Sequence, residues 1–253
     1  TCTYGAVGAF ATGVGSTDLA SVMASGKIWL RVPESMKVIF QGKLPLGVYS
    51  KDMALYLAGK ISASGAIYQC IEFEGETIGD LSMEARFTLS NMAMELGAKA
   101  GIIRGDEKTR KWLAEHTKRE INFLNPDIDA SYTKVLEYNV SKLSPCVAKP
   151  HSVDNVAFIE DVKGIPIQQA FLGTCTNGRL EDLRIAADII GERKIHPKVR
   201  FIVAPASQKI YLKALEEGIL RTFVKAGAAV VTPGCGCCVG THNGVPANGE
   251  NVI

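Results

Sequence analysis

The sequence lacks an excess of charge of either sign. Its 28 lysines and arginines nearly balance 26 aspartates and glutamates, for a formal net charge of +2. A basic surface for nucleic acid or for an anionic membrane is therefore not expected, and a small-molecule ligand is favoured. Long apolar runs are also missing, because no stretch approaches the roughly 18 to 20 residues of a membrane span, and no signal-type segment is present. We expect a soluble, cytoplasmic protein with no nucleic-acid or membrane partner.

The cysteine pattern does not suit a disulfide framework. The chain has seven cysteines, an odd number, and three of them crowd into residues 235–238. Disulfide-rich domains are usually short and carry their cysteines in pairs. This chain has 253 residues with 47% hydrophobic content, which is enough for one large or two ordinary α/β domains with packed cores. We therefore expect reduced thiols in an intracellular α/β protein.

Composition and periodicity divide the chain into three blocks. Residues 1–33 are rich in glycine, alanine, serine and threonine and are interpreted as the remnant of a first domain. Residues 34–155 and 156–253 are predicted to form a second and a third α/β domain. The elements predicted for the second block are a helix at 50–61, a strand at 67–73, helices at 83–97 and 106–119, and an irregular connector at 122–152.

The third block has the most regular pattern. Its predicted elements are strands at 167–172, 199–204 and 227–232, which alternate with helices at 180–190 and 207–217. This βαβαβ order predicts a parallel sheet with right-handed crossovers. Parallel strands place their carboxyl ends along one edge, so Cys175 and the turn at 235–238 can meet in the crevice there.

Three cysteines, Cys175, Cys235 and Cys238, follow predicted buried strands at glycine-containing turns. A structural zinc site needs four ligands, and Cys237 could complete such a set, although neighbouring Cys237 and Cys238 are hard to aim at one ion. An iron–sulfur cluster needs only soft sulfur donors, and three thiolates leave one iron open to act as a Lewis acid. A thioredoxin-like redox pair is a weaker alternative, because no helix is predicted directly after Cys235.

The other cysteines are interpreted as packing residues. Cys2, Cys70 and Cys146 lie outside the two cysteine motifs, and Cys70 falls on a predicted strand. A cysteine in such a position usually behaves as a small hydrophobic side chain. These three thiols are therefore left out of the predicted metal centre.

Four segments carry a family resemblance. They are GTCTNGRLEDL at 173–183, PGCGCCVGTHNG at 233–244, LSMEARFTLSNMAMELGAKAG at 81–101 and SPCVAKPHSVDNV at 144–156. The first two resemble the cysteine motifs of the aconitase superfamily, and the other two resemble its central region. Within that superfamily the similarity is to the large subunits of 3-isopropylmalate dehydratase and homoaconitase.

The resemblance implies a fold, a cofactor and a reaction. The fold is an α/β arrangement of aconitase-like three-layer domains with mainly parallel sheets. The cofactor is a 4Fe-4S cluster held by Cys175, Cys235 and Cys238. The reaction is dehydration and rehydration of a small 2-hydroxy di- or tricarboxylic acid, as in the isopropylmalate step of leucine biosynthesis, with homoaconitase as the alternative. A separate small subunit is implied as a partner. A non-catalytic metal- or cluster-binding module is the alternative from another class.

The resemblance also implies site residues and shows departures. Glu95 matches the catalytic glutamate that partners a histidine, Asn91 lies one helical turn earlier on the same face, and both Asn91 and Thr1 are implied to bind substrate. A helical glutamate is otherwise most often a solvated side chain. The family's Asp-Ser-His before Thr1 and its Asn-Arg-Asn-Phe run after Ile253 are absent, so the chain is expected to be an internal portion. Cys237 stands where a non-ligand is usual.

Overall fold

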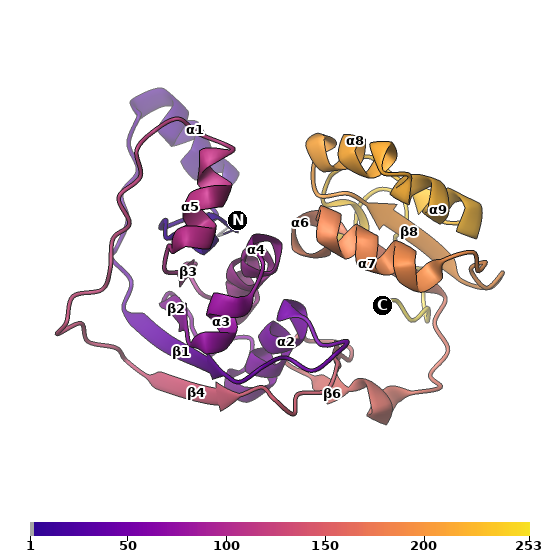
Figure 1. Ribbon diagram of the computed structural model, residues 1–253, viewed down its shortest axis with the longest axis horizontal. Coiled ribbons are helices and arrows are strands. Elements are labelled where there is room, and N and C mark those ends of the chain that lie inside the picture. The colour runs from indigo at the N-terminus through magenta and orange to yellow at the C-terminus, as the bar shows by residue number, and fades with distance from the viewer. Residues whose placement is uncertain (1–2) are drawn as a thin grey trace. The chain divides into compact units, whose positions relative to one another are not determined.

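The computed structural model describes residues 3–253. The chain divides into two compact units, Thr1–Val162 (unit 1) and Lys163–Ile253 (unit 2), which are coloured indigo to salmon pink and orange to yellow in Figure 1. The domain boundaries predicted near residues 33 and 155 stay predictions. In the part of the chain that the structure describes, none of the helices has the length and apolar character needed to cross a membrane.

Unit 1 is built on a four-stranded parallel sheet with the strand order β3-β2-β1-β4. The strands are β1 (Ser35–Gln41), β2 (Cys70–Glu74), β3 (Ala100–Ile103) and β4 (Val135–Asn139). Side chains alternate along β1, so Met36, Val38 and Phe40 are fully buried while Lys37 and Ile39 are half-buried on the other face. The main core of the unit therefore lies on one face of this sheet.

The helices of unit 1 are η1 (Thr3–Val7), α1 (Ser16–Ser25), α2 (Ser50–Ile61), α3 (Glu76–Asp80), α4 (Met83–Met92), η2 (Ala93–Leu96), α5 (Glu107–Ala114) and η3 (Ile159–Val162). Helices α2, α3, α4 and η2 contribute residues to the core on that face of the sheet. Helix α2 has the predicted bounds, because Asp52 accepts the Tyr49 N–H at 2.8 Å and Met53 and Leu57 recur on its buried face. A short antiparallel pair, β5 (Cys146–Ala148) with β6 (Val156–Phe158), packs beside α2.

Three predictions for unit 1 were wrong in detail. The helix predicted at 83–97 ends at Met92 and continues as the 3-10 turn η2, which closes on Gly97 with φ +79°. The chain turns there because β3 lies so close that a Cβ on Gly101 would stand 2.7 Å from the Ala93 Cβ. The helix predicted at 106–119 is shorter, at Glu107–Ala114. The connector predicted at 122–152 contains the edge strand β4, which pairs with β1.

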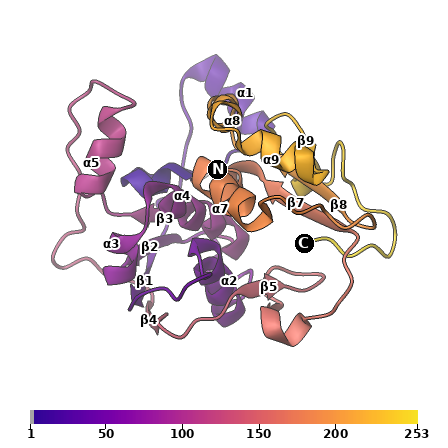
Figure 2. The same ribbon diagram turned by 45° about the vertical axis from the view of Figure 1, so that its right-hand side comes forward.

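Unit 2 confirms the predicted βαβαβ order with a three-stranded parallel sheet, β7-β8-β9 (Figure 2). Its elements are β7 (Gln169–Gly173), α6 (Thr174–Asn177), α7 (Leu180–Ile190), β8 (Arg200–Ala204), α8 (Gln208–Glu216), α9 (Ile219–Ala226), β9 (Ala229–Val230) and η4 (Gly236–Val239). The sequence reading missed α9, which buries Ile219, Leu220 and Phe223. The strand predicted at 227–232 is only two residues long.

The two faces of the β7-β8-β9 sheet are covered differently. Leu172, Phe201 and Val203 pack with the apolar faces of α7, α8 and α9 in one core cluster. On the other face, β7 and β8 pair Gln169 with Arg200 and Phe171 with Ile202. The chain that follows β9 returns across this second face, and Val252 forms a parallel bridge with Gln169 at the edge of the sheet.

Candidate functional site

The carboxyl edge of the unit 2 sheet carries the first cysteine motif. Strand β7 ends at Gly173, and Cys175 lies half-buried in the single turn of α6 that follows. Gly173 and Gly178 approach the β8 backbone so closely that a Cβ on either would stand 2.3 or 2.6 Å from the Ala204 carbonyl oxygen. This close approach fixes the position of the Cys175 turn against the end of β8.

Two further contacts shape the Cys175 turn. Thr174 is buried and has a φ of +64°, a conformation that costs a non-glycine residue about 1 kcal/mol or more and marks a constrained turn. The Arg179 Nη2 donates to the Cys175 carbonyl oxygen at 3.0 Å. The sequence analysis did not single out Arg179, which is the extended N-cap residue of α7, directly after the turn that carries Cys175.

The second cysteine motif follows β9. Cys235 and Cys238 are exposed at the ends of one tight turn, in which the Cys238 N–H donates to the Cys235 carbonyl oxygen at 3.0 Å. Cys237 is half-buried and turns toward Gly244, where a Cβ would stand 3.4 Å from the Cys237 sulfur. Burial, with a smaller contribution from neighbouring Cys238, raises the pKa of the Cys237 thiol. Cys237 therefore differs from the two exposed cysteines that flank it.

The three predicted ligands share an edge without forming a closed metal site. Cys175 follows β7 and Cys235 and Cys238 follow β9, in one parallel sheet. Within residues 3–253, no three His, Cys, Asp or Glu side chains gather closely enough to hold a metal ion. The donor set fits a soft metal centre, because all three groups are thiols. Ligation of one centre by all three would require the Cys175 turn and the Cys235–Cys238 turn to move closer together.

In unit 1 the structure separates the predicted Asn91 and Glu95. Asn91 is 8% exposed in the last turn of α4, and its Oδ1 accepts a hydrogen bond from the Thr3 Oγ1 at 3.0 Å. Glu95 is exposed on η2, beyond the end of α4, so the two do not share the face of one continuous helix as predicted. Thr1 lies outside the described residues. The sequence reading missed Thr3, which lies in the same small-residue segment as Thr1.

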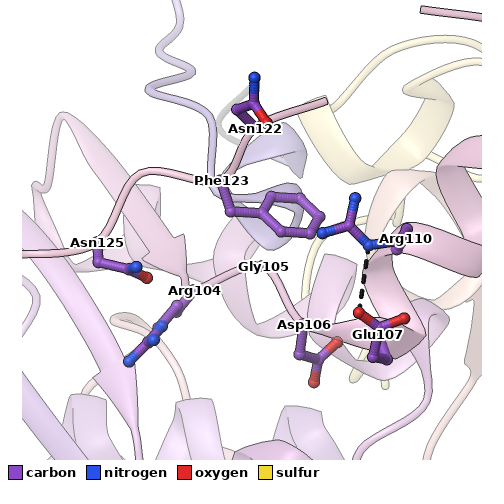
Figure 3. Close-up of a pocket in the computed structure, with 8 residues that line it drawn as sticks. All are labelled: Arg104, Gly105, Asp106, Glu107, Arg110, Asn122, Phe123 and Asn125. Carbon is purple, nitrogen blue, oxygen red and sulfur yellow. Dashed lines mark hydrogen bonds and ion pairs between the residues drawn. The ribbon is translucent and has the colours of Figure 1, made fainter. Parts of the chain in front are cut away.

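A hollow of about 360 Å³ opens at the carboxyl end of β3 (Figure 3). Its wall includes Arg104, Asp106, Glu107, Arg110 and Phe123. Arg110 bonds to the Glu107 carboxylate at 3.2 Å and lies 5.0 Å from the centre of the Phe123 ring, and Asp106 accepts from the buried Arg86 at 2.6 Å. Because the charges of Asp106, Glu107 and Arg110 are all paired, we explain the hollow by the packing of α5 rather than by catalysis.

Comparison with known proteins extends over the whole chain. The aconitase family (aconitate hydratase) matches residues 1–253. The large subunit 2 of 3-isopropylmalate dehydratase from Archaeoglobus fulgidus is 53% identical over 255 residues, covering 100% of this chain and 61% of the relative. A probable methanogen homoaconitase large subunit from Methanothermobacter thermautotrophicus is 51% identical over 250 residues, covering 99% of this chain and 58% of the relative.

A solved structure is also similar. Aconitase X from Thermococcus kodakaraensis, in its holo form, matches with a TM-score of 0.42 and 12% identity, over 81% of this chain and 44% of that one. The chain spans between 58% and 61% of the length of the two curated relatives. The family match takes in both units and both cysteine motifs. The chain belongs to the aconitase family.

Proposed function

We propose that this chain is part of the large subunit of an iron–sulfur hydro-lyase of the 3-isopropylmalate dehydratase type. The observation that carries the proposal is that Cys175, Cys235 and Cys238 follow strands β7 and β9 of one parallel sheet, at its carboxyl edge. The 53% identity to a protein named as such a large subunit supports it. The name of that relative also supports a separate small subunit as the partner.

The proposed cofactor is a 4Fe-4S cluster held by Cys175, Cys235 and Cys238. A cluster with three thiolate ligands leaves one iron without a protein ligand, which supplies Lewis-acid chemistry for a hydroxyl and a carboxylate group. Cys237 is assigned a packing role because its side chain turns toward Gly244.

The proposed roles in unit 1 follow from exposure and hydrogen bonding. Glu95 is exposed on η2, so its carboxylate can take up or release a proton. Asn91 is buried, and its Oδ1 is engaged by Thr3, so its amide orientation is fixed and suits a positioning role for a polar substrate. Thr1 is proposed to bind substrate. The substrate class is a small 2-hydroxy di- or tricarboxylic acid.

Cluster binding is the first test of this function. Anaerobic reconstitution of the chain should give about four irons and about four sulfides with broad visible absorption. Cys175→Ser should abolish this binding, because a hydroxyl is a poor ligand for the cluster. The matched control is Cys146→Ser, which changes a half-buried cysteine of unit 1 and should leave the iron content unchanged. An intact cluster signal in Cys175→Ser would show the ligand assignment to be wrong.

The same analysis tests the alternative from another class. The alternative is a non-catalytic zinc module, in which Cys237 would join Cys175, Cys235 and Cys238 as a fourth ligand. Such a module would bind one zinc and no inorganic sulfide. Metal and sulfide analysis of the same reconstituted sample therefore separates the two functions.

Homoaconitase activity is a second candidate for the substrate. It is favoured by the relative of that name, which is 51% identical to this chain. The test is an assay of the full-length protein with its small subunit and an intact cluster, with isopropylmalate, homocitrate and citrate offered side by side. We expect isopropylmalate to react fastest. A higher rate with homocitrate would favour homoaconitase.

A further inference from the structure

A polar network joins three residues on the face of the unit 2 sheet that lies opposite its helices. Gln169 is 0% exposed, and its Oε1 accepts from the Arg200 Nε at 3.2 Å. The Arg200 guanidinium holds the Glu250 carboxylate through two hydrogen bonds of 2.8 and 2.5 Å. We name Gln169, Arg200 and Glu250 the clasp. Paired hydrogen bonds of this kind fix both the distance and the orientation of the two side chains.

The clasp holds the chain that returns from the second cysteine motif. The Gln169 Nε2 donates to the Gly244 carbonyl oxygen at 2.6 Å, and the Glu250 carboxylate accepts from the Ala247 N–H at 2.7 Å. The backbone of the last residues adds to the edge of β7, where the Phe171 N–H donates to the Ile253 carbonyl oxygen at 2.7 Å. The clasp therefore fastens both ends of the segment 244–253 to the sheet.

Gly244 connects the clasp to the cysteine turn. Its φ is +91°, and a Cβ there would stand 2.3 Å from the Ile202 Cδ1 and 3.4 Å from the Cys237 sulfur. Gly244 thus lies between the central strand and the residue in the middle of the Cys235–Cys238 turn. Loss of the hydrogen bond from buried Gln169 would leave the Gly244 carbonyl without this donor and loosen that packing.

We propose that the clasp is a positioning device for the proposed cluster centre, because it fixes Gly244 and through it the turn that carries Cys235 and Cys238. The inference rests on the proposed function. None of the three clasp residues is a proposed ligand or touches substrate, so all three act through the turn. Their effect should appear in how long the cluster is retained.

The chain offers a matched control for the clasp. Arg184 and Glu217 form an equally short bidentate pair, with distances of 2.7 and 2.6 Å, between α7 and the end of α8. The two arginines are similarly exposed, 50% for Arg184 and 49% for Arg200. The Arg184 pair joins α7 to the residue that follows α8, on the helical side of the sheet. Glu217→Gln therefore removes a comparable pair from the same unit without touching the clasp.

The experiment measures iron loss to a chelator from the reconstituted chain, followed by visible absorption. Glu250→Gln should accelerate iron loss roughly two- to fivefold, the effect expected of one exposed ion pair. Gln169→Leu should accelerate it about tenfold or more, because a buried hydrogen bond is lost. Glu217→Gln should leave the rate unchanged. Denaturation midpoints of the two glutamate variants should be similar, which separates positioning from general stability.

Hydrogen exchange of the apoprotein provides an independent readout. Residues 233–249 should exchange faster in Glu250→Gln than in the parent chain, and Glu217→Gln should match the parent. Equal iron loss in the parent, Glu250→Gln and Gln169→Leu would overturn the positioning role. A parent chain that binds no iron would overturn the proposed function instead. In that event, unchanged exchange at 233–249 would also show that the clasp does not hold the turn.

Discussion

In unit 1 the chain that leaves β3 is locked by a buried arginine, whereas in unit 2 the chains that leave β7 and β9 present thiols at the corresponding edge. Arg86 is 1% exposed and donates to Asp106 at 2.6 Å and to the Gly79 carbonyl oxygen at 3.1 Å. The Lys108 ammonium donates to three carbonyl oxygens at the end of α3, with distances from 2.6 to 3.1 Å. In unit 2, Cys235 and Cys238 are exposed at this edge.

The difference teaches that one parallel-sheet edge can serve stability and another can serve ligand binding. A buried cation, Arg86, with its paired carboxylate, Asp106, holds the edge of unit 1 together. In unit 2, the packing that holds the turn of Cys235 and Cys238 comes from the face of the sheet opposite its helices, through Gly244 and the clasp. The following predictions test this contrast.

The largest expected effect is that of Arg86→Ala on the stability of unit 1. The change removes a buried guanidinium, leaves a cavity and deprives Gly79 and Asp106 of one donor each, so the free energy of unfolding should fall by about 3–5 kcal/mol. Both tryptophans, Trp29 and Trp112, lie in unit 1. Denaturant unfolding followed by tryptophan fluorescence therefore reports on this unit.

Arg110→Ala is the control for Arg86→Ala. Arg110 is 51% exposed and pairs with Glu107, which is 80% exposed. Its removal should cost about 1 kcal/mol or less, because exposed pairs contribute little. If the two variants lost the same free energy of unfolding, Arg86 would not be what holds the edge of unit 1 together. The proposed difference between the edges of the two units would then be wrong.

The sequence predictions were accurate where the pattern that defines an element lies within the element itself. The helices α2 and α7 have the predicted bounds, since apolar residues recur along each on the face that packs in its core. Strand β4 was missed because it is an edge strand with alternating exposure, and its pairing with β1 is a long-range contact. Helix α9 was missed because Gly218, with φ +75°, separates it from α8 and leaves only eight residues for a helical pattern.

A second, smaller effect is expected for Gly178→Ala in unit 2. A Cβ there would stand 2.6 Å from the Ala204 carbonyl oxygen and 2.7 Å from the Thr174 backbone, so these atoms must shift. Such overpacking should cost about 1–3 kcal/mol and displace the Cys175 turn. Thermal unfolding followed by circular dichroism, together with iron content after reconstitution, measures both consequences.

Gly234→Ala is the matched control in the second cysteine motif. A Cβ on Gly234 would meet nothing within 4 Å. Both stability and iron content should therefore stay close to those of the parent chain. If Gly178→Ala kept the stability and iron content of the parent chain, as expected for Gly234→Ala, the Cys175 turn would accept an added Cβ as easily as the exposed turn does. The close approach of Gly178 to Ala204 would then not be needed for cluster binding.

The sequence predicted the candidate site only as far as the order of strands and helices determines it. Alternation of strands and helices places Cys175 and the Cys235–Cys238 turn on one edge, and the structure has that strand order. The clasp was not predicted, because Gln169 and Arg200 become neighbours through the register of β7 and β8, and Glu250 joins them from a returning segment. No local pattern in the sequence links these three positions.

The smallest expected effect is the weakening of the clasp at low pH. The hydrogen bond from Arg200, with one from the Ala247 N–H, lowers the pKa of Glu250 from 4.5 to about 2. A carboxylate with a lowered folded pKa contributes its stability in full above the unfolded value and loses it as the pH falls through the folded value. The clasp should therefore be complete above pH 4.5 and weaken progressively toward pH 2, which hydrogen exchange at Phe171 and Ile253 can follow.

The Arg86–Asp106 pair of unit 1 should outlast the clasp on acidification. Burial alone would raise the pKa of Asp106, but the hydrogen bond from Arg86 outweighs it and holds this pKa well below 3.8. Its contribution is thus complete down to about pH 3.8 and is lost at a lower pH than that of Glu250. In Glu250→Gln, exchange at Ile253 should already be fast at neutral pH and should change little with acid. If hydrogen exchange in both units of the parent chain became fast at the same pH, the proposed difference between the two sheet edges would be wrong.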